Sequence, residues 1–550
     1  MSMGHHSRNG AQHSYDSGAS DRSLVGGTIG EALDRAVRAH GDREAFVDRA
    51  SGTRLTYSRL AEEVDAVSKA LLRIGVQRGD RVALWAHNSW KWAVVQYAVA
   101  GVGAVLVNVN PVYTMGELSY VLKHTGTRVL LTATAEGGTD HVAVGERMRH
   151  DISCLEHVVL LDEAWSWFLA AGHAVSHADL ARARAGLDQD DVVNIQFTSG
   201  TTGLPKGATL SHHNILNNGF SVGELLRYTE EDRICLPVPF FHCFGMVMGN
   251  LAALTHGACV VIPGPRFGAS LVLDTVEEEL CTSLYGVPTM FIAELADPGF
   301  DERDLSSLRT GIMSGAPCPV EVMNGVVERM GVHEIAICYG MTETSPVLTQ
   351  TRADDPVWRR VSTVGRVGPH VEIKIVDPRT GRVVPRGTPG ELRARGYSVM
   401  LGYWDEPEKT DEVIDSGRWM RTGDLTVMDA DGYVSVIGRI KDMVVRGGEN
   451  ISPREVEEFL HTHPDVLDAQ VVGVPDHYYG EELAVCLRMA PNAAPLSEED
   501  LRRFCDGHLA RFKIPRYVRI VDSYPMTASG KVRKVDLREE TAALLGLDGR

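Results

Sequence analysis

Residues 198–207 read Thr198-Ser-Gly-Thr-Thr-Gly-Leu-Pro-Lys-Gly207, directly after an apolar run at 192–197 that is typical of a buried strand. The glycines of this stretch let backbone N–H groups turn toward a ligand, and its hydroxyl side chains add further donors. Lys206 adds a positive charge. A loop of this composition at the end of a strand suits a polyphosphate, and the rest of the chain can be interpreted around it.

The loop differs from the usual nucleotide P-loop, which needs Gly-Lys-Ser/Thr after four residues, because Pro205 occupies the position of the second glycine. A polar surface loop rich in small residues is the alternative interpretation. The density of hydroxyl residues next to a Lys-Gly pair, straight after a strand, favours a phosphate site over that alternative.

Strand and helix patterns alternate on both sides of this loop. Such alternation is typical of doubly wound α/β layers, in which ligands bind where the strands end. An antiparallel pair is expected at residues 45–47 and 54–57. The other expected strands lie at 81–85, 104–108, 129–132, 158–161 and 192–197 before the loop and at 233–237, 258–262, 283–286, 310–313 and 336–339 after it.

The pattern changes near residue 346. From there to about 438, short alternating strands are separated by Pro and Gly turns, which predicts a small β-barrel or sandwich. Residues 440–550 predict a small α+β domain, with a first helix that begins at a capping box, Ser452-Pro-Arg-Glu455. We therefore expect an α/β multidomain fold: a large N-terminal domain of two doubly wound α/β subdomains plus a small β-barrel, and a mobile α+β C-terminal domain.

The formal net charge of -18, from 55 Lys+Arg against 73 Asp+Glu, disfavours nonspecific binding to nucleic acid or anionic membranes. The nine cysteines are scattered without Cys-x-x-Cys or zinc spacing, so a reducing, cytoplasmic setting is expected. Two apolar stretches, 92–109 and 238–262, are interrupted by polar residues and are expected to be buried elements, not membrane spans. Residues 1–23 are small and polar, and a disordered leader is expected there.

Four further clusters follow strands or tight turns: Tyr339-Gly-Met-Thr-Glu343, Thr422-Gly-Asp424, Gly438-Arg-Ile-Lys-Asp442 and Pro525-Met-Thr-Ala-Ser-Gly-Lys531. Each alone has a structural explanation, such as a capping carboxylate, a turn former or a surface lysine. In this order and spacing, together with the glycine-rich loop, they resemble the acyl-adenylate-forming (AMP-binding) superfamily. That superfamily includes acyl-CoA synthetases, luciferases and the adenylation domains of peptide synthetases, and the resemblance covers about residues 25–540.

The resemblance implies an ATP site assembled from several loops. The residues that it assigns to the β- and γ-phosphates are Thr198, Ser199, Gly200, Thr201, Thr202, Gly203 and Lys206. Those that it assigns to the adenine are Gly315, Ala316 and Pro317, with Tyr339 stacking on the base and Gly340 beside it. Asp424 would accept both ribose hydroxyls, with Arg439 beside it.

The resemblance also implies the reacting centre. Thr342 would contact the α-phosphate, Glu343 would bind Mg²⁺, and Lys531 would bridge the attacking carboxylate and the α-phosphate. We expect His242 to be a further catalytic residue. For the step that uses coenzyme A, Lys441 would be a hinge, and Gly447, Gly448 and Glu449 would line the pantetheine channel.

These roles have a physical reason. A carboxylate that attacks a phosphate meets like-charge repulsion, so cations are needed where charge accumulates. Thiol attack on the resulting anhydride needs other neighbours, which a rotation of the C-terminal domain about Lys441 would bring in. The expected domains are a leader at 1–23, an AMP-binding domain at 24–438 with its β-barrel at about 346–438, and a C-terminal lid domain at 439–550.

The stretch Phe240-Phe-His-Cys-Phe-Gly245 contains no acid where amino-acid-activating relatives carry an aspartate, so an amino acid substrate is disfavoured. The apolar residues 246–254, with Met313 and Val347, predict a pocket for an alkyl chain. We therefore expect a fatty acid–CoA ligase that forms acyl-AMP from a medium- or long-chain acid, releases pyrophosphate and transfers the acyl group to coenzyme A.

Four alternatives remain at this point. They are an aryl-acid ligase, a ligase that loads a carrier protein, a luciferase-like oxygenase, and a regulatory acyl-binding protein, the last disfavoured by the intact Lys531. The expected partners are small molecules, and neither nucleic acid binding nor a membrane span is expected. The expected assembly is a monomer or a homodimer.

Overall fold

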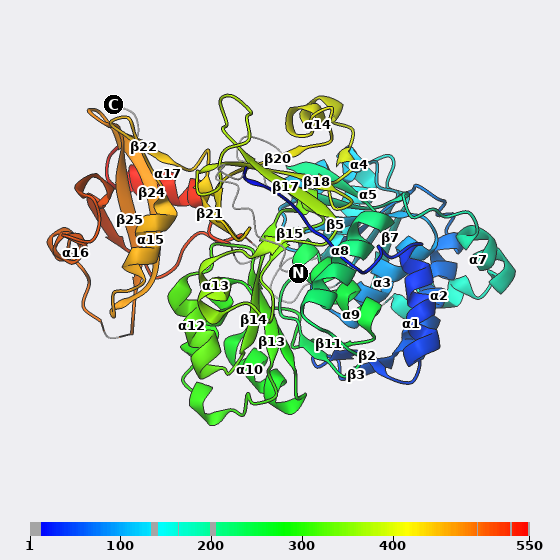
Figure 1. Ribbon diagram of the computed structural model, residues 1–550. Coiled ribbons are helices and arrows are strands. Elements are labelled where there is room, and N and C mark those ends of the chain that lie inside the picture. The colour runs from blue at the N-terminus through cyan, green and yellow to red at the C-terminus, as the bar shows by residue number, and fades with distance from the viewer. Residues whose placement is uncertain are drawn as a thin grey trace, which may run out of the picture.

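The computed structural model describes residues 13–133, 141–162, 164–198, 205–491, 493–527 and 531–547. Two large mixed sheets, a five-stranded antiparallel sheet and a five-stranded C-terminal sheet form the molecule (Figure 1). Helices cover the sheets, so the predicted α/β multidomain fold is confirmed. Within the described ranges, no helix has both the length and the apolar character needed to cross a bilayer.

The first large sheet carries the strand that precedes the glycine-rich loop. Its strands run in the order β19-β9-β8-β5-β4-β6-β7, and β8 to β7 are parallel, as expected for a doubly wound layer. The bounds are β4 Arg81–Trp85, β5 Val105–Val109, β6 Val129–Thr132, β7 His157–Leu160, β8 Val192–Thr198, β9 Lys206–Ser211 and β19 Gly402–Tyr403.

The second large sheet has nine strands in the order β16-β15-β14-β13-β12-β10-β11-β2-β3. The predicted antiparallel pair β2–β3 lies at its edge, next to β11, although about 200 residues of chain separate them. The bounds are β2 Glu44–Asp48, β3 Thr53–Thr56, β10 Arg233–Cys235, β11 Cys259–Ile262, β12 Ser283–Gly286, β13 Thr310–Ser314, β14 Glu334–Gly340, β15 Val347–Gln350 and β16 Arg366–Val367.

The β-rich part, expected as a small β-barrel, is an antiparallel sheet whose pairings run in the open order β1-β17-β18-β20-β21. Its predicted extent, about 346–438, needs a correction, because β15, β16 and β19 inside this range pair with the two large sheets. Short strands carry no sequence signal for their partner, so only the tertiary structure assigns them. The bounds are β1 Tyr15–Ser17, β17 Val371–Val376, β18 Gly390–Gly396, β20 Met420–Met428 and β21 Val434–Arg439.

The prediction of a disordered leader at 1–23 is wrong for its described part. Residues 15–17 form β1, which pairs with β17 in antiparallel register, Tyr15 opposite Lys374. The Tyr15 hydroxyl donates to Glu372 at 2.7 Å, and its ring meets Trp419 edge-on. A three-residue strand among small polar residues has too weak a pattern to be recognised without the sheet edge that it covers. Residues 1–12 lie outside the described ranges.

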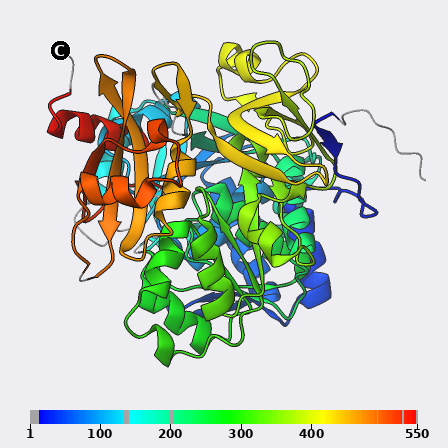
Figure 2. The same ribbon diagram turned by 60° about the vertical axis from the view of Figure 1, so that its left-hand side comes forward.

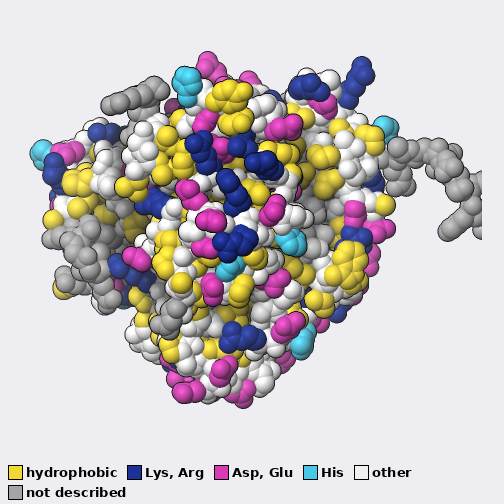
Figure 3. All heavy atoms as spheres, turned by 90° about the vertical axis from the view of Figure 1, so that its left-hand side faces the viewer, with side chains coloured by type: hydrophobic (Ala, Val, Ile, Leu, Met, Phe, Trp, Pro, Cys, Tyr) yellow, Lys and Arg dark blue, Asp and Glu magenta, His cyan; other side chains and the backbone are white. Residues whose placement is uncertain are grey.

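The C-terminal unit is an α+β body beside the larger one, orange to red in Figures 1 and 2. Two apolar clusters inside residues 444–547 form its own core. Lys and Arg side chains gather near the middle of the face that it presents in Figure 3, with Asp and Glu around them. Its strands are β22 Val444–Arg446, β23 Glu449–Ile451, β24 Val466–Asp476, β25 Gly480–Met489 and β26 Tyr517–Ile520. The boundary at 438/439 stays a prediction.

The residues that precede α8 and α15 differ in capping. Ser211 caps α8, because Asn214 N donates to Ser211 Oγ at 3.2 Å and Ser211 N donates to Asn214 Oδ1 at 2.8 Å. The capping box predicted at 452–455 is wrong: the Ser452 hydroxyl instead donates to Ile437 O at 2.6 Å. A contact with the preceding strand has replaced the local one.

The helices α1 to α9 are Ile29–His40, Tyr57–Arg73, Trp90–Gly101, Met115–Thr125, His141–Asp151, Trp165–Gly172, His177–Arg184, His212–Leu225 and Ala252–His256. The helices α10 to α17 are Ala269–Glu278, Pro288–Leu295, Val320–Arg329, Val357–Ser362, Pro407–Val413, Pro453–Leu460, Glu498–Cys505 and Lys534–Leu544. The apolar residues 246–254 lie in a π-helix, η1 Phe244–Leu251, and in α9, which continues it. A short 3₁₀ helix, η3 Thr342–Thr344, follows β14.

Candidate active site

The phosphate end of the predicted site lies where β8 gives way to β9. The two strands are antiparallel, with Thr198 opposite Lys206, and the Thr198 hydroxyl donates to Lys206 O at 3.5 Å. Both residues therefore lie at the mouth of the loop that the sequence singles out. The predicted phosphate ligands Ser199, Gly200, Thr201, Thr202 and Gly203 lie outside the described residues.

A tyrosine that the sequence analysis did not identify connects two predicted site residues. The hydroxyl of Tyr403, on β19, donates to Glu343 Oε1 at 2.9 Å, and both side chains are buried. The ammonium nitrogen of Lys206 lies 4.8 Å from the centre of the same ring. The predicted metal carboxylate and the predicted phosphate-binding lysine thus share one aromatic neighbour.

Glu343 is suited to a magnesium ion that arrives with a nucleotide. Mg²⁺ in phosphoryl-transfer sites is often held by one or two carboxylates plus phosphate oxygens. Glu343 is 8% exposed and has its Oε1 fixed by Tyr403. Across the described residues, no group of three or more His, Cys, Asp or Glu side chains could hold a metal ion.

The predicted adenine residues follow neighbouring parallel strands of the second sheet. Gly315, Ala316 and Pro317 come directly after β13, and Tyr339 and Gly340 end β14. Because the carboxyl ends of parallel strands meet at one edge, the structure brings these five residues together. Gly315 has φ of +91°, a conformation that favours glycine.

The predicted ribose carboxylate is buried and bonded to its predicted neighbours. Asp424, on β20, accepts a hydrogen bond from the Tyr339 hydroxyl at 2.7 Å and faces Arg439 Nε at 3.3 Å. Burial raises the pKa of Asp424, and Arg439 and the tyrosine hydroxyl act in the opposite direction. A carboxylate next to a tyrosine ring at the end of a strand can accept hydrogen bonds from the hydroxyl groups of a bound diol.

Lys531 reaches this centre from the C-terminal unit. A methyl group built on Gly315 would come 3.3 Å from Lys531 Cε, which places the lysine stem against the predicted adenine loop. Burial and, after it, the charge of Arg439 lower the pKa of Lys531 to about 8, with Cys243 and Glu343 acting in the opposite direction. Backbone bonds hold the lysine in place: Thr527 N donates to Lys531 O at 2.6 Å and Lys531 N donates to Thr527 Oγ1 at 3.0 Å.

His242 is a neutral imidazole in this structure. Burial lowers its pKa to about 3, and the neighbouring Lys531 lowers it as well. Phe244 N donates to His242 Nδ1 at 3.2 Å, so Nδ1 carries no proton and Nε2 is an N–H donor. His242 can therefore donate a hydrogen bond to a ligand oxygen, but it supplies no positive charge near neutral pH.

A polar network lies behind His242. Burial raises the pKa of the Cys243 thiol to about 12, although a hydrogen bond with the Thr342 hydroxyl acts in the opposite direction. The thiol donates to Gln196 Oε1 at 2.9 Å. Thr342, the predicted α-phosphate contact, is thereby joined to β8 of the other large sheet. The network links the two sheets at the site.

The predicted coenzyme A residues and the predicted hinge lie elsewhere. Gly447 and Gly448 have φ of +59° and +91° and precede Glu449 in the turn between β22 and β23. Gly447 N donates to Tyr479 O at 2.9 Å, a contact inside the C-terminal unit. Lys441 is exposed in the turn between β21 and β22. The structure thus places Lys531 against the predicted adenine loop, whereas the backbone contact of Gly447 is with its own unit.

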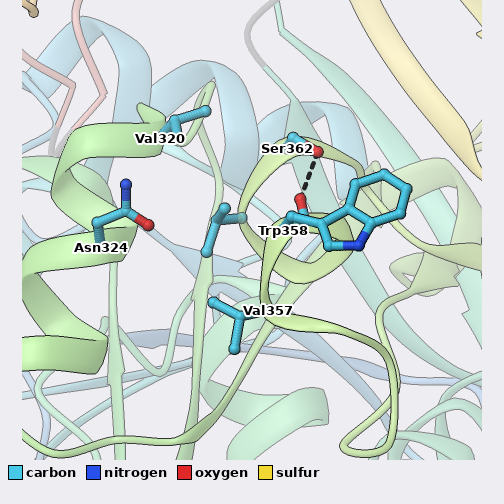
Figure 4. Close-up of a pocket in the computed structure, with 6 residues that line it drawn as sticks. Val320, Asn324, Val357, Trp358 and Ser362 are labelled. Carbon is cyan, nitrogen blue, oxygen red and sulfur yellow. Dashed lines mark hydrogen bonds between the residues drawn. The ribbon is translucent and has the colours of Figure 1, made fainter.

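The residues expected to line an acyl pocket begin in the π-helix η1, whose eight residues are all buried. It includes Met246, one of the expected pocket residues, and Met313 and Val347 are buried as well. A separate open groove lies between α12 and α13 (Figure 4) and is lined by Val320, Asn324, Val357, Trp358, Val361 and Ser362. Its six residues include no predicted site residue.

Sequence reasoning missed Tyr403 and Gln196. Tyr403 sits in Gly402-Tyr-Trp404, and an aromatic pair after a glycine is a common sequence, so the pattern alone gave little reason to single it out. Gln196 sits inside an apolar strand, where a lone amide that is expected to be buried needs a partner. The lone amide in an apolar strand is thus a signal by which Gln196 could have been predicted to form a buried hydrogen bond.

Two family models match the chain: AMP-binding enzyme over residues 33–404 and AMP-binding enzyme C-terminal domain over residues 455–531. "Putative acyl-CoA synthetase YngI" of Bacillus subtilis is 46% identical over 544 residues, covering 95% of this chain and 99% of its own. "Medium-chain acyl-CoA ligase ACSF2, mitochondrial" of Danio rerio is 40% identical over 555 residues, covering 97% and 91%.

Among solved structures, the anthranilate CoA ligase AuaEII in complex with anthranoyl-AMP is similar to this chain. The TM-score is 0.84 at 28% sequence identity, and the match covers 96% of this chain and 99% of the other. The similarity extends over both the larger body and the C-terminal unit, since little of either chain is left out.

Proposed function

The chain belongs to the AMP-binding enzyme family, and on that premise we propose that it is an ATP-dependent acyl-CoA synthetase that activates a medium-chain fatty acid. The observation that carries the proposal is the position of Lys531, from the C-terminal unit, against Gly315 and beside Arg439 and Glu343 of the larger body. Two parts of the chain thereby place cations over one site, which the joining of two anions requires.

In the first proposed step, a carboxylate oxygen of the acid attacks the α-phosphorus of ATP, and the bond to the β-phosphate breaks to release pyrophosphate. Lys531 would lie between the two reactants, Lys206 would face the departing phosphates, and Thr342 would contact the α-phosphate. Glu343 would hold a magnesium ion, which supplies positive charge against the phosphate oxygens. His242 would donate from Nε2 as a neutral group.

In the second proposed step, the sulfur of coenzyme A attacks the acyl carbon, the bond to the phosphate oxygen breaks, and AMP leaves. The thiol proton passes to solvent. This step would need Lys531 to leave and the Gly447–Glu449 turn to approach, by rotation about Lys441 at the boundary near residue 438/439. Glycines at positive φ in that turn support a close approach of backbone to a narrow ligand.

The fatty-acid assignment rests on the apolar side of the site. The wall formed by η1 is buried throughout, and the segment 240–245 contains no carboxylate that could pair with an amino group. The names of two relatives, an acyl-CoA synthetase and a medium-chain acyl-CoA ligase, support the same class. The likeness to an anthranilate CoA ligase favours an aryl acid as the second candidate.

The proposed setting is the cytoplasm, as a monomer or a homodimer with small-molecule substrates. All nine cysteines are free thiols, which supports a reducing compartment. The relatives whose names include "mitochondrial" make a second reducing compartment the alternative.

The test is ATP–pyrophosphate exchange by the purified chain with acetate, hexanoate, decanoate, palmitate and benzoate. We expect exchange to be fastest with hexanoate or decanoate and acyl-CoA to appear when coenzyme A is added. Fastest exchange with benzoate would support the aryl-acid candidate. Acyl-AMP that persists with coenzyme A and disappears only with a carrier protein would identify a loading ligase, and no exchange with any acid would contradict the proposal.

A further inference from the structure

Tyr403 contacts both charged groups of the phosphate end. Its hydroxyl donates to Glu343 Oε1 at 2.9 Å, and its ring lies under the Lys206 ammonium at 4.8 Å. The tyrosine is 8% exposed, so little water competes for either contact.

The backbone around Tyr403 makes the same two connections. Met400 N donates to Glu343 O at 2.9 Å, on the side of the carboxylate. On the side of the lysine, Trp404 N donates to Gly207 O at 2.7 Å, and β19 pairs with β9 so that Tyr403 lies opposite Ala208. A five-residue segment is therefore bonded to η3 of one subdomain and to the strand that carries Lys206 in the other.

Groups that orient a metal-binding carboxylate affect the metal almost as much as the ligand does. A lysine on a flexible stem needs a second contact to hold its ammonium group in one place. We propose that Tyr403 is a positioning residue that fixes the Glu343 carboxylate by its hydroxyl and the Lys206 ammonium by its ring, so that a magnesium–nucleotide complex meets both in register. The inference rests on the proposed function, because it gives these groups a common ligand.

The two contacts can be separated by substitution. Tyr403→Phe removes the hydroxyl and keeps the ring, and Tyr403→Leu removes both. Tyr433→Phe is a matched control, because the Tyr433 hydroxyl donates to the buried Asp355 at 2.5 Å and Arg359 lies 4.3 Å from its ring centre. The control loses the same kind of bond outside the site.

The first readout is binding, measured without turnover. Mn²⁺ serves as a probe by electron paramagnetic resonance, in the presence of a nonhydrolysable ATP analogue. We expect Tyr403→Phe to weaken Mn²⁺ binding about 10-fold or more, as for other residues that orient a metal ligand. The KM for ATP in pyrophosphate exchange should rise clearly only in Tyr403→Leu, and Tyr433→Phe should match the wild type in both measurements.

A second comparison excludes a merely structural role. In a Glu343→Gln background, Tyr403→Phe should change Mn²⁺ binding by less than about twofold, because the two residues act through one contact. Equal losses in Tyr403→Phe and Tyr433→Phe, wild-type Mn²⁺ binding by Tyr403→Phe, or additive losses with Glu343→Gln would each overturn the inference. A wild-type chain that binds the Mn²⁺–nucleotide complex but activates no acid would contradict the proposed function and leave this inference standing.

Discussion

At the scale of single residues, the site contains ionisable groups whose charged forms are destabilised by burial. The pKa of Lys531 falls to about 8 and that of His242 to about 3, whereas the pKa of Asp424 rises. Each shift has the sign expected when water is withdrawn from a charge. The lysine is the group whose pKa lies nearest to physiological pH, so its charge is the one that pH can remove.

We expect kcat/KM for ATP in pyrophosphate exchange to fall as pH rises through about 8. The lysine ammonium loses its proton there in the free enzyme, and kcat/KM reports the free enzyme. Lys531→Arg keeps its charge at alkaline pH and should show a slower but flat profile. A wild-type profile that stays level from pH 7 to 9.5, or the same fall in the arginine variant, would contradict this assignment.

Glu294, on α11, is a buried carboxyl away from the predicted site residues. It is fully buried, neither oxygen has a hydrogen-bond partner within the described structure, and burial raises its pKa to about 8. The folded state therefore keeps a proton that the unfolded chain loses above about pH 4.5. The contribution of Glu294 to the free energy of unfolding is therefore largest below that pH. It falls by about 1.4 kcal/mol per pH unit until about pH 8.

Glu294→Met should remove this loss at nearly constant volume. The variant is expected to unfold at a higher urea concentration than the wild type at pH 7.5, with a difference that shrinks toward pH 5. Urea midpoints of both proteins at several pH values would measure it. A difference that is independent of pH would show that Glu294 is ionised, or bonded, in the folded state.

At the scale of elements, the π-helix η1 has carbonyl oxygens that accept bonds from buried side chains of its neighbours. Met246 O accepts from Gln96 Nε2 at 3.2 Å, and Asn250 Nδ2 donates back to Gln96 Oε1 at 3.0 Å. The Tyr285 hydroxyl donates to Met248 O at 3.0 Å. A wide helical turn is rare and is often found at functional sites, and here side chains of α3 and β12 support it.

Gln96→Leu should destabilise the fold by about 2–4 kcal/mol, because Met246 O and the Asn250 amide lose a partner in a dry interior. It should also broaden the chain-length preference, since Met246 belongs to the proposed acyl wall. Gln77→Leu, at an exposed position, is the control and should stay within about 0.5 kcal/mol. Thermal unfolding and the acid panel measure the two effects, and an unchanged panel would separate η1 from substrate choice.

At the scale of the whole molecule, polar contacts join the C-terminal unit to β21 of the larger body, and Lys531 joins it to the predicted site. Arg454 Nη1 donates to Val436 O at 2.8 Å, the Ser452 hydroxyl donates to Ile437 O, and the Lys531 stem lies against Gly315 of the predicted adenine loop. A separate core in residues 444–547 lets the C-terminal unit move as one body. Such an arrangement suits a rotation that exchanges one set of neighbours for another.

We predict that Lys441→Pro spares adenylation and impairs thioester formation by about tenfold or more. Proline fixes φ at this turn and restricts the residue before it, so rotation is hindered while the described arrangement is retained. Pyrophosphate exchange measures the first step, and acyl-CoA formation from supplied acyl-AMP measures the second. Lys441→Ala is the control and should retain both. Equal losses of the two steps in the proline variant would refute the hinge.

Much of this fold could be predicted, because strand and helix periods are local. The parallel strands, the helix cap at Ser211 and the motif order all follow from residues close in the sequence. The adenine loop and Tyr339 could be placed together from their position after parallel strands. The order of the motifs indicated the family, since five loops in one order leave few other interpretations.

What the tertiary structure alone decided is which distant segments meet. Hydrogen bonds between residues distant in the sequence set the pairing partners of β1 and β19. Such bonds also replace the capping box at Ser452 and join Tyr403 to Glu343. Local propensity has no information about such partners. The pKa values of Lys531 and His242 were hidden for the same reason, because burial is a property of the packed molecule and not of the residue.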